Sequence, residues 1–125
     1  MIKTLYIALG GAVGTLCRYL VGVGLARALP GKMPWGTLAV NVVGSFIIGV
    51  VMALFAERDA LDSQLRMALT IGFLGGFTTY SAFAFEVVTL AKDGELATLG
   101  LYLTLLLALS LGGCLAGIAL GRLVA

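Results

Sequence analysis

Hydrophobic side chains fill long stretches of this 125-residue chain with almost no charge between them. Uncharged stretches cover residues 33–56, 67–85 and 96–121, and a fourth, 4–26, is interrupted only by Arg18. A helix needs about 20 apolar residues to cross a bilayer. The pattern therefore predicts one all-α membrane domain, residues 1–125, with four transmembrane helices. Their expected bounds are about residues 4–28, 35–56, 66–91 and 96–122.

The composition supports a membrane protein, because 61% of the residues are hydrophobic and only 11% are charged. A soluble domain carries about a quarter charged residues. The first apolar stretch is longer than the core of a secretory signal and ends without a clean small-residue cleavage site, so we expect it to be a membrane span. The net charge of +2 comes with scattered basic residues, which do not form a nucleic-acid-binding pattern.

The chain offers little for catalysis. It has no His, the commonest general base, and its acids form no evident metal-binding or proton-coupling group. Cys17 and Cys114 both fall inside apolar stretches, where packing is the expected role. We therefore expect no enzyme activity.

Basic residues at the helix ends are divided almost evenly between the two sides of the membrane. Lys3, Arg58, Arg66 and Arg122 are expected on the side of both termini, and Arg27, Lys32 and Lys92 on the other. Such residues normally set the orientation of a membrane protein. A weakly biased single orientation is one interpretation. The favoured one is that copies insert both ways and pair antiparallel, giving the inverted symmetry that many transporters obtain from fused repeats.

Two rows of glycines at four-residue spacing would allow helices to approach closely. We expect them to serve association between copies, since four helices of this size enclose little space alone. The rows are Gly10, Gly14 and Gly22 in the first helix and Gly113, Gly117 and Gly121 in the last.

Several polar residues interrupt the apolar spans, where polar groups are costly and usually face a partner or a wet cavity. Asn41 shares a face with Ser45 in the second span, either to join helices or to line a pore. The Arg18 side chain could extend toward the membrane–water interface. Because it lies on the same helix face as the glycine row, however, we expect it to face protein. Glu86 allows the same two interpretations. In the last span Tyr102, Thr104 and Ser110 could join helices.

The segment GGFTTYSAFAFE, residues 75–86, is the most informative. Gly75-Gly76 should weaken the third helix in mid-membrane, which is tolerated only where the backbone is buried or lines a cavity. Its freed carbonyls could hold a small cation. Phe77, Tyr80 and Phe83 follow at three-residue spacing, and their electropositive ring edges could attract an anion. Ordinary packing is the alternative for this aromatic row.

These motifs resemble those of the Fluc (CrcB) family of fluoride channels over essentially the whole chain. The matching segments are GGAVGTLCRY, WGTLAVNVVGSFIIG and GFLGGFTTYSAFAFE, in the first three spans. The resemblance implies an antiparallel, dual-topology homodimer in the bacterial inner membrane. It also implies two fluoride pores, a structural sodium ion at the dimer centre, and passive export that gives fluoride resistance.

The resemblance also assigns residues. The carbonyls of Gly75 and Thr78 would hold sodium together with those of a second copy. Arg18 would lie near an electropositive vestibule, and Glu86 closes the family motif. The implied pore residues are Asn41, Tyr80, Ser81, Phe83, Tyr102 and Ser110.

Four positions depart from the usual family pattern. Tyr80 replaces the usual Phe, Ala82 the usual Thr, and Ala84 the usual Ser, while some relatives carry a hydroxyl where this chain has Leu106. These departures bear on the roles of individual pore residues more than on the class of protein.

Two other classes of small membrane protein share some of these features. A small multidrug exporter would need an acid in the first span, where this chain has Arg18. A non-transporting membrane assembly subunit would account for the glycine rows but not for polar and aromatic residues at a helix break.

Overall fold

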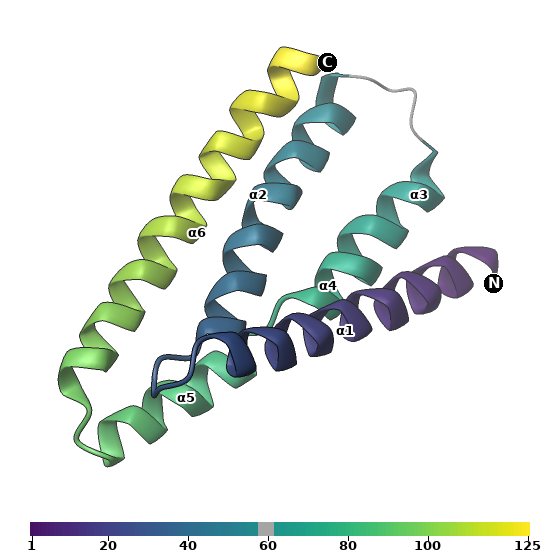
Figure 1. The fold of residues 1–125 in the computed structure, drawn as a ribbon. Coiled ribbons are helices and arrows are strands. Elements are labelled where there is room, and N and C mark those ends of the chain that lie inside the picture. Colours follow the sequence, from purple (N-terminus) through teal and green to yellow (C-terminus); the bar gives the residue numbers. More distant parts are fainter. Residues whose placement is uncertain (58–61) are drawn as a thin grey trace.

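The computed structural model describes residues 1–57 and 62–125, and every regular element in these ranges is helical (Figure 1). Arg58, one of the basic residues in the topology argument, lies outside them. The elements in chain order are α1 (Ile2–Ala28), α2 (Trp35–Glu57), α3 (Ser63–Met67), the π-helical segment η1 (Ala68–Leu74), α4 (Gly75–Phe77), α5 (Ser81–Lys92) and α6 (Leu96–Val124).

Four stretches of helix are long and apolar enough to cross a membrane, which confirms the expected number of spans. They are Ile2–Ala28, Trp35–Ala56, Ser63–Lys92 and Leu96–Val124. The chain is thus an all-helical, multi-pass membrane protein.

α2 and α6 lie side by side over much of their length (Figure 1). The contact is close because α6 presents glycines to α2. A Cβ atom on Gly117 would collide with the carbonyl oxygen of Phe46, and one on Gly121 would lie 2.7 Å from the Cβ of Ala53. Gly49 on α2 contacts the backbone of Cys114 in the same way.

α1 packs against η1 and α4, again through glycine. A side chain on Gly10 would collide with the carbonyl oxygen of Ala68, and one on Gly14 with that of Phe73. The expectation that the glycine rows join separate copies is therefore wrong for these contacts. Gly10, Gly14, Gly117 and Gly121 pack helices within one chain, because backbones that approach this closely leave no room for a Cβ, whereas a Cβ on Gly22 would meet no atom within 4 Å.

The third span is not a continuous helix. α4 ends at Phe77, Thr78 is extended with φ −88° and ψ 162°, and α5 begins at Ser81. The interruption follows the glycine pair rather than coinciding with it, since Gly75 keeps helical angles of −61° and −37°. Gly76 has a packing role: its Cβ would lie 2.5 Å from the Gly11 carbonyl oxygen on α1.

The loop between α1 and α2 meets the turn between α5 and α6. Nζ of Lys32 and Oε1 of Glu95 form an ion pair of 2.5 Å across these connections. Its hydrogen bond and the charge of Glu95 raise the pKa of Lys32. Gly94, with φ +73°, allows the chain to make the turn between α5 and α6. Lys32 therefore lies at the same end of the molecule as the α5–α6 turn.

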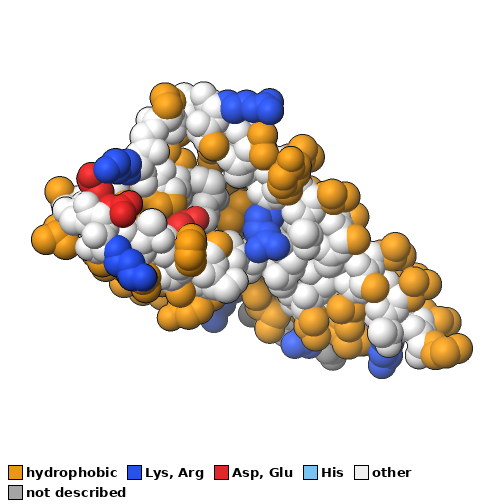
Figure 2. Space-filling view, turned by 90° about the horizontal axis from the view of Figure 1, so that it is seen from below, with side chains coloured by type: hydrophobic (Ala, Val, Ile, Leu, Met, Phe, Trp, Pro, Cys, Tyr) orange, Lys and Arg blue, Asp and Glu red, His pale blue; other side chains and the backbone are white. Residues whose placement is uncertain are grey.

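The exterior is strongly apolar. In Figure 2 hydrophobic side chains cover much of the visible face, and the acidic side chains gather near one end of it. Leu5, Leu9, Leu16 and Leu20 are among many large apolar residues of α1 that are exposed. Leu38, Leu90, Tyr102 and Leu106 form a small buried cluster between helices. Lipid or another protein surface must cover the remainder.

Candidate functional site

Asn41 on α2 pairs with the backbone of Thr79 where the third span is interrupted. Its Nδ2 donates to the Thr79 carbonyl oxygen at 2.9 Å, and the Thr79 N–H donates to its Oδ1 at 3.0 Å. One amide side chain thus satisfies both backbone groups of a residue outside the helix. An Asn amide has two N–H groups, and the second has no partner among the described residues.

The two threonines at the interruption bond to the helix ends on either side. Oγ1 of Thr78 donates to the carbonyl oxygen of Leu74 at 2.8 Å, at the end of η1. Oγ1 of Thr79 accepts from the N–H of Ala82 at 3.2 Å, which caps the start of α5. Together with Asn41, these hydroxyls hold an extended turn between two helices.

An open pocket of about 300 Å³ combines this turn with the aromatic row. Asn41, Ser45, Thr78, Thr79, Tyr80, Phe83, Leu106 and Leu107 line it. The rings of Tyr80 and Phe83 are tilted by 54° with centroids 5.6 Å apart. The structure therefore places one amide and two tilted rings, three of the expected pore residues, around one space. Tyr80 is 79% exposed, so the pocket is open on that side.

Glu86 joins three helices through its carboxylate. Oγ1 of Thr37 on α2 donates to Oε1 of Glu86, and the hydroxyl of Tyr102 on α6 donates to Oε2, both at 2.7 Å. The Tyr102 side chain is fully buried, and its ring lies 5.7 Å from that of Phe83. Both carboxylate oxygens are thus engaged by hydroxyls.

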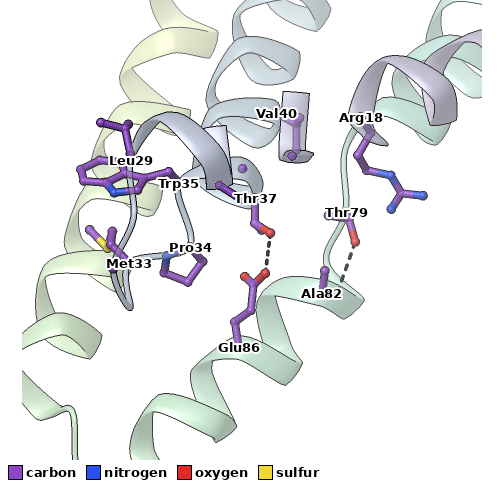
Figure 3. Close-up of a pocket in the computed structure, with 14 residues that line it drawn as sticks. Arg18, Leu29, Met33, Pro34, Trp35, Thr37, Val40, Thr79, Ala82 and Glu86 are labelled. Carbon is purple, nitrogen blue, oxygen red and sulfur yellow. Dashed lines mark hydrogen bonds between the residues drawn. The ribbon is translucent and has the colours of Figure 1, made fainter. Parts of the chain in front are cut away.

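Arg18 lies across a second pocket, of about 360 Å³, from Glu86 (Figure 3). Arg18 enters from α1, Thr37 from α2, and Ala82 and Glu86 from α5 (Figure 3). Within the described ranges Arg18 forms no ion pair. This pocket shares Thr79 with the aromatic pocket.

A third pocket, of about 310 Å³, contains both residues expected to bind sodium. Gly75 and Thr78 line it together with Asn41. No group of three or more His, Cys, Asp or Glu side chains suited to a metal ion exists in the described part of the chain. A cation here would have to use neutral oxygens, those of the backbone, of hydroxyls or of the Asn41 amide.

Three expected pore residues do not line these pockets: Ser81, Ser110 and Tyr102, which bonds to Glu86. Ser81 is exposed at the first position of α5. Ser110 lies on α6 with its hydroxyl oxygen buried and without a hydrogen-bond partner among the described residues. A buried hydroxyl of this kind is costly to leave unsatisfied.

Sequence reasoning did not identify Thr37 as part of the site. A signal for it exists in the spacing, because Thr37, Asn41 and Ser45 repeat every four residues on one face of α2. Only the fold shows that this face meets Glu86.

Comparison with known proteins identifies one family and relatives that match nearly the whole chain. Residues 5–118 match the family model described as CrcB-like protein, Camphor Resistance (CrcB). A protein of Rhizobium leguminosarum bv. trifolii, named fluoride-specific ion channel FluC, is 46% identical over 125 residues, all of both chains. Proteins of the same name from Agrobacterium fabrum and Nitrobacter winogradskyi are 45% and 42% identical, over 98% and 96% of this chain and 98% and 95% of theirs.

Proposed function

Since the chain belongs to the CrcB family, we propose that it forms a passive, fluoride-selective channel in the bacterial plasma membrane. Family membership, expected from the motifs, is confirmed by the match over residues 5–118 and by the full-length relatives. Fluoride is the ion named for those relatives, and the pocket beside the helix interruption supports the same ion here.

The observation that carries the proposal is the joining of Asn41, Tyr80 and Phe83 around one pocket. Fluoride is small and strongly hydrated, so a pore must replace its water with other donors. The second N–H of Asn41 can donate a hydrogen bond, and ring edges carry partial positive charge. Neutral donors of this kind bind an ion well enough to dehydrate it and weakly enough to release it.

Further residues extend the path on both sides of this pocket. Arg18, without an ion-pair partner in the described ranges, attracts anions into the adjoining pocket. The hydroxyls of Thr37 and Tyr102 donate to both carboxylate oxygens of Glu86 and hold this side chain in place at the border of that pocket. Ser110 supplies a buried hydroxyl with no partner in the described part of the chain.

Conduction is passive in this proposal. The chain has no nucleotide-binding motif and no acid in its first span to couple a proton to transport. Chloride is excluded because a path narrow enough to replace fluoride's hydration shell is too narrow for the larger ion. The consequence for a bacterium is the release of fluoride that enters as hydrofluoric acid and ionises in the cytoplasm.

We further propose an antiparallel homodimer with two pores. Four basic residues face three in the orientation count, so either insertion is accessible. The aromatic pocket is open at Tyr80, and a second copy would close it. The apolar outer face of the chain supplies surface for that contact.

A structural sodium ion would suit the centre of such a dimer. The carbonyls of Gly75 and Thr78 are oxygen donors, the class that hard cations prefer. Both residues border one open pocket. One chain offers too few such oxygens to surround a cation, and two copies would double the number. A bound sodium ion would supply a fixed positive charge that joins the copies.

The test of channel function is an efflux assay with purified protein in liposomes. When the membrane potential is shunted, we expect rapid release of fluoride and negligible release of chloride. Protein-free liposomes give the background leak of both ions. Equal rates for the two ions, or fluoride release no faster than background, would contradict the proposal.

A further inference from the structure

The amide hydrogen of Thr79 is directed away from its usual helical partner. In a continuous α-helix this N–H would donate to the carbonyl oxygen four residues earlier, that of Gly75. Here it donates to Oδ1 of Asn41 at 3.0 Å. A side chain from α2 therefore takes the hydrogen bond that would have continued α4.

Two carbonyl oxygens are left free as a result. Within residues 1–57 and 62–125, no hydrogen bond reaches the carbonyl oxygen of Gly75 or of Thr78. For Thr78 the reason is similar, since the Ala82 N–H that would reach it donates to Oγ1 of Thr79 instead. Gly75 is exposed and Thr78 is half-buried, and both border the same open pocket, so their oxygens are accessible to a ligand.

We propose that Asn41 is a positioning residue for a monovalent cation bound by the Gly75 and Thr78 carbonyls. All three residues line the same 310 Å³ pocket. By holding the Thr79 N–H, Asn41 prevents α4 from continuing and keeps the Gly75 carbonyl available. This inference rests on the proposed function and adds a role for Asn41 beyond contact with the anion.

The Thr78–Thr79 peptide group connects the Asn41 hydrogen bond with the proposed cation site. Its N–H is bonded to Asn41, and its carbonyl is one of the two proposed cation ligands. Hydrogen bonds and charges on one peptide group polarise each other. A cation on the Thr78 carbonyl should therefore strengthen the bond to Asn41, which also lines the aromatic pocket. Cation binding and the geometry of the anion pocket are coupled through one side chain.

The sequence allows this coupling to be measured at single sites. Thr78–Thr79 is the chain's one Thr–Thr pair, and Asn41 is its one asparagine. Protein labelled with ¹³C-carbonyl, ¹⁵N-threonine gives one directly bonded pair, and ¹⁵N-asparagine gives one side-chain amide. Spectra of the intact protein are compared in sodium chloride and in N-methylglucamine chloride at equal ionic strength, without fluoride.

We expect sodium to shift the Thr78 carbonyl, the Thr79 amide and Nδ2 of Asn41 together, with one concentration dependence. No sodium-dependent shift at Thr78 would overturn the cation site. A shift at Thr78 with no response at Asn41 would overturn the positioning role. Both results come from the unmutated protein, so neither depends on whether a variant folds.

Asn41→Leu provides the second measurement, because it keeps the size of the side chain and removes both hydrogen bonds. We expect the sodium-dependent shift at Thr78 to be lost. Thr70→Val is the matched control: Thr70 lines the same pocket, but its hydroxyl donates to the Arg66 carbonyl oxygen one turn earlier, in α3. The control should keep the shift. An unchanged shift in Asn41→Leu would refute the inference, whereas failure of wild-type fluoride efflux would refute the channel proposal separately.

Discussion

The hydroxyl of Tyr102 on α6 donates a 2.7 Å hydrogen bond to Oε2 of Glu86 on α5. α5 has few other contacts with α6, so this bond, with the Phe83–Tyr102 ring contact, fixes the aromatic row against the last span.

Tyr102→Phe should destabilise the protein while keeping the ring contact with Phe83. The change leaves one oxygen of the half-buried Glu86 carboxylate without its donor, which costs about 1 kcal/mol. Denaturant unfolding in detergent measures the loss. Thr104→Val is the control, since that hydroxyl donates only to the Gly100 carbonyl on an exposed face of α6. Equal stability of the two variants would show that the Glu86 bond contributes nothing.

Phe83→Ile should suppress fluoride efflux while the folded protein persists. Ile retains apolar bulk but lacks the electropositive ring edge that the proposed path uses. Tyr80→Phe keeps a ring and restores the usual family residue, so its efflux should equal or exceed that of the wild type. Normal efflux from Phe83→Ile would identify the aromatic row as packing. Loss in Tyr80→Phe would make the hydroxyl a ligand.

Gly117→Ala should lower stability by about 1–3 kcal/mol, because the added methyl collides with the Phe46 carbonyl and forces α2 and α6 apart. Gly112→Ala is the matched control on the same helix. A Cβ there has no atom within 4 Å, and Ala favours helix over Gly by up to about 1 kcal/mol. In thermal unfolding, Gly117→Ala should therefore have a lower Tm than the wild type and Gly112→Ala an equal or higher one. Similar decreases in Tm for both variants would count against the packing argument.

A reporter fused to the C-terminus should be found on both sides of the membrane. With four basic residues against three, neither orientation has a decisive advantage. Two or three added Lys residues at one end should force a single orientation and reduce efflux when that variant is the only copy. Coexpression with an oppositely biased variant should restore it. Full efflux from a chain with one orientation would exclude the antiparallel dimer.

The ion pair between Lys32 and Glu95 should stabilise the joined loops up to strongly alkaline pH. Because Glu95 raises the pKa of Lys32, the stabilisation is complete below the ordinary lysine pKa of 10.5 and is lost as pH rises through the higher folded value. In Glu95→Gln, the dependence of unfolding temperature on pH above 10 should flatten. The pair is exposed, so high salt should also weaken it. An unchanged alkaline profile in the variant would contradict this assignment.

The number of spans and the family could be predicted from sequence, since uncharged length and the residue 75–86 motif require no tertiary information. The grouping of Asn41 with the aromatic row also followed from family resemblance. The position of the helix interruption did not, because Gly76 stays within α4, packed closely on α1, and Asn41 from another helix accepts the hydrogen bond of the Thr79 N–H. Similarly, Thr37 is an ordinary threonine until α2 and α5 bring it to Glu86.

The use of glycine inside the chain has a consequence for how the sequence can vary among relatives. Helices that meet backbone to backbone admit almost no substitution at Gly14 or Gly117, since any side chain collides with a carbonyl group. The exposed side of α1 carries large apolar side chains, Leu5, Leu9, Leu16 and Leu20 among them, with no such constraint. We expect amino-acid replacements to accumulate on that face, so that copies from diverging lineages lose their fit for one another while each chain keeps its own fold. Two paralogous copies in one cell could thus become separate, mutually exclusive assemblies through changes on that face alone.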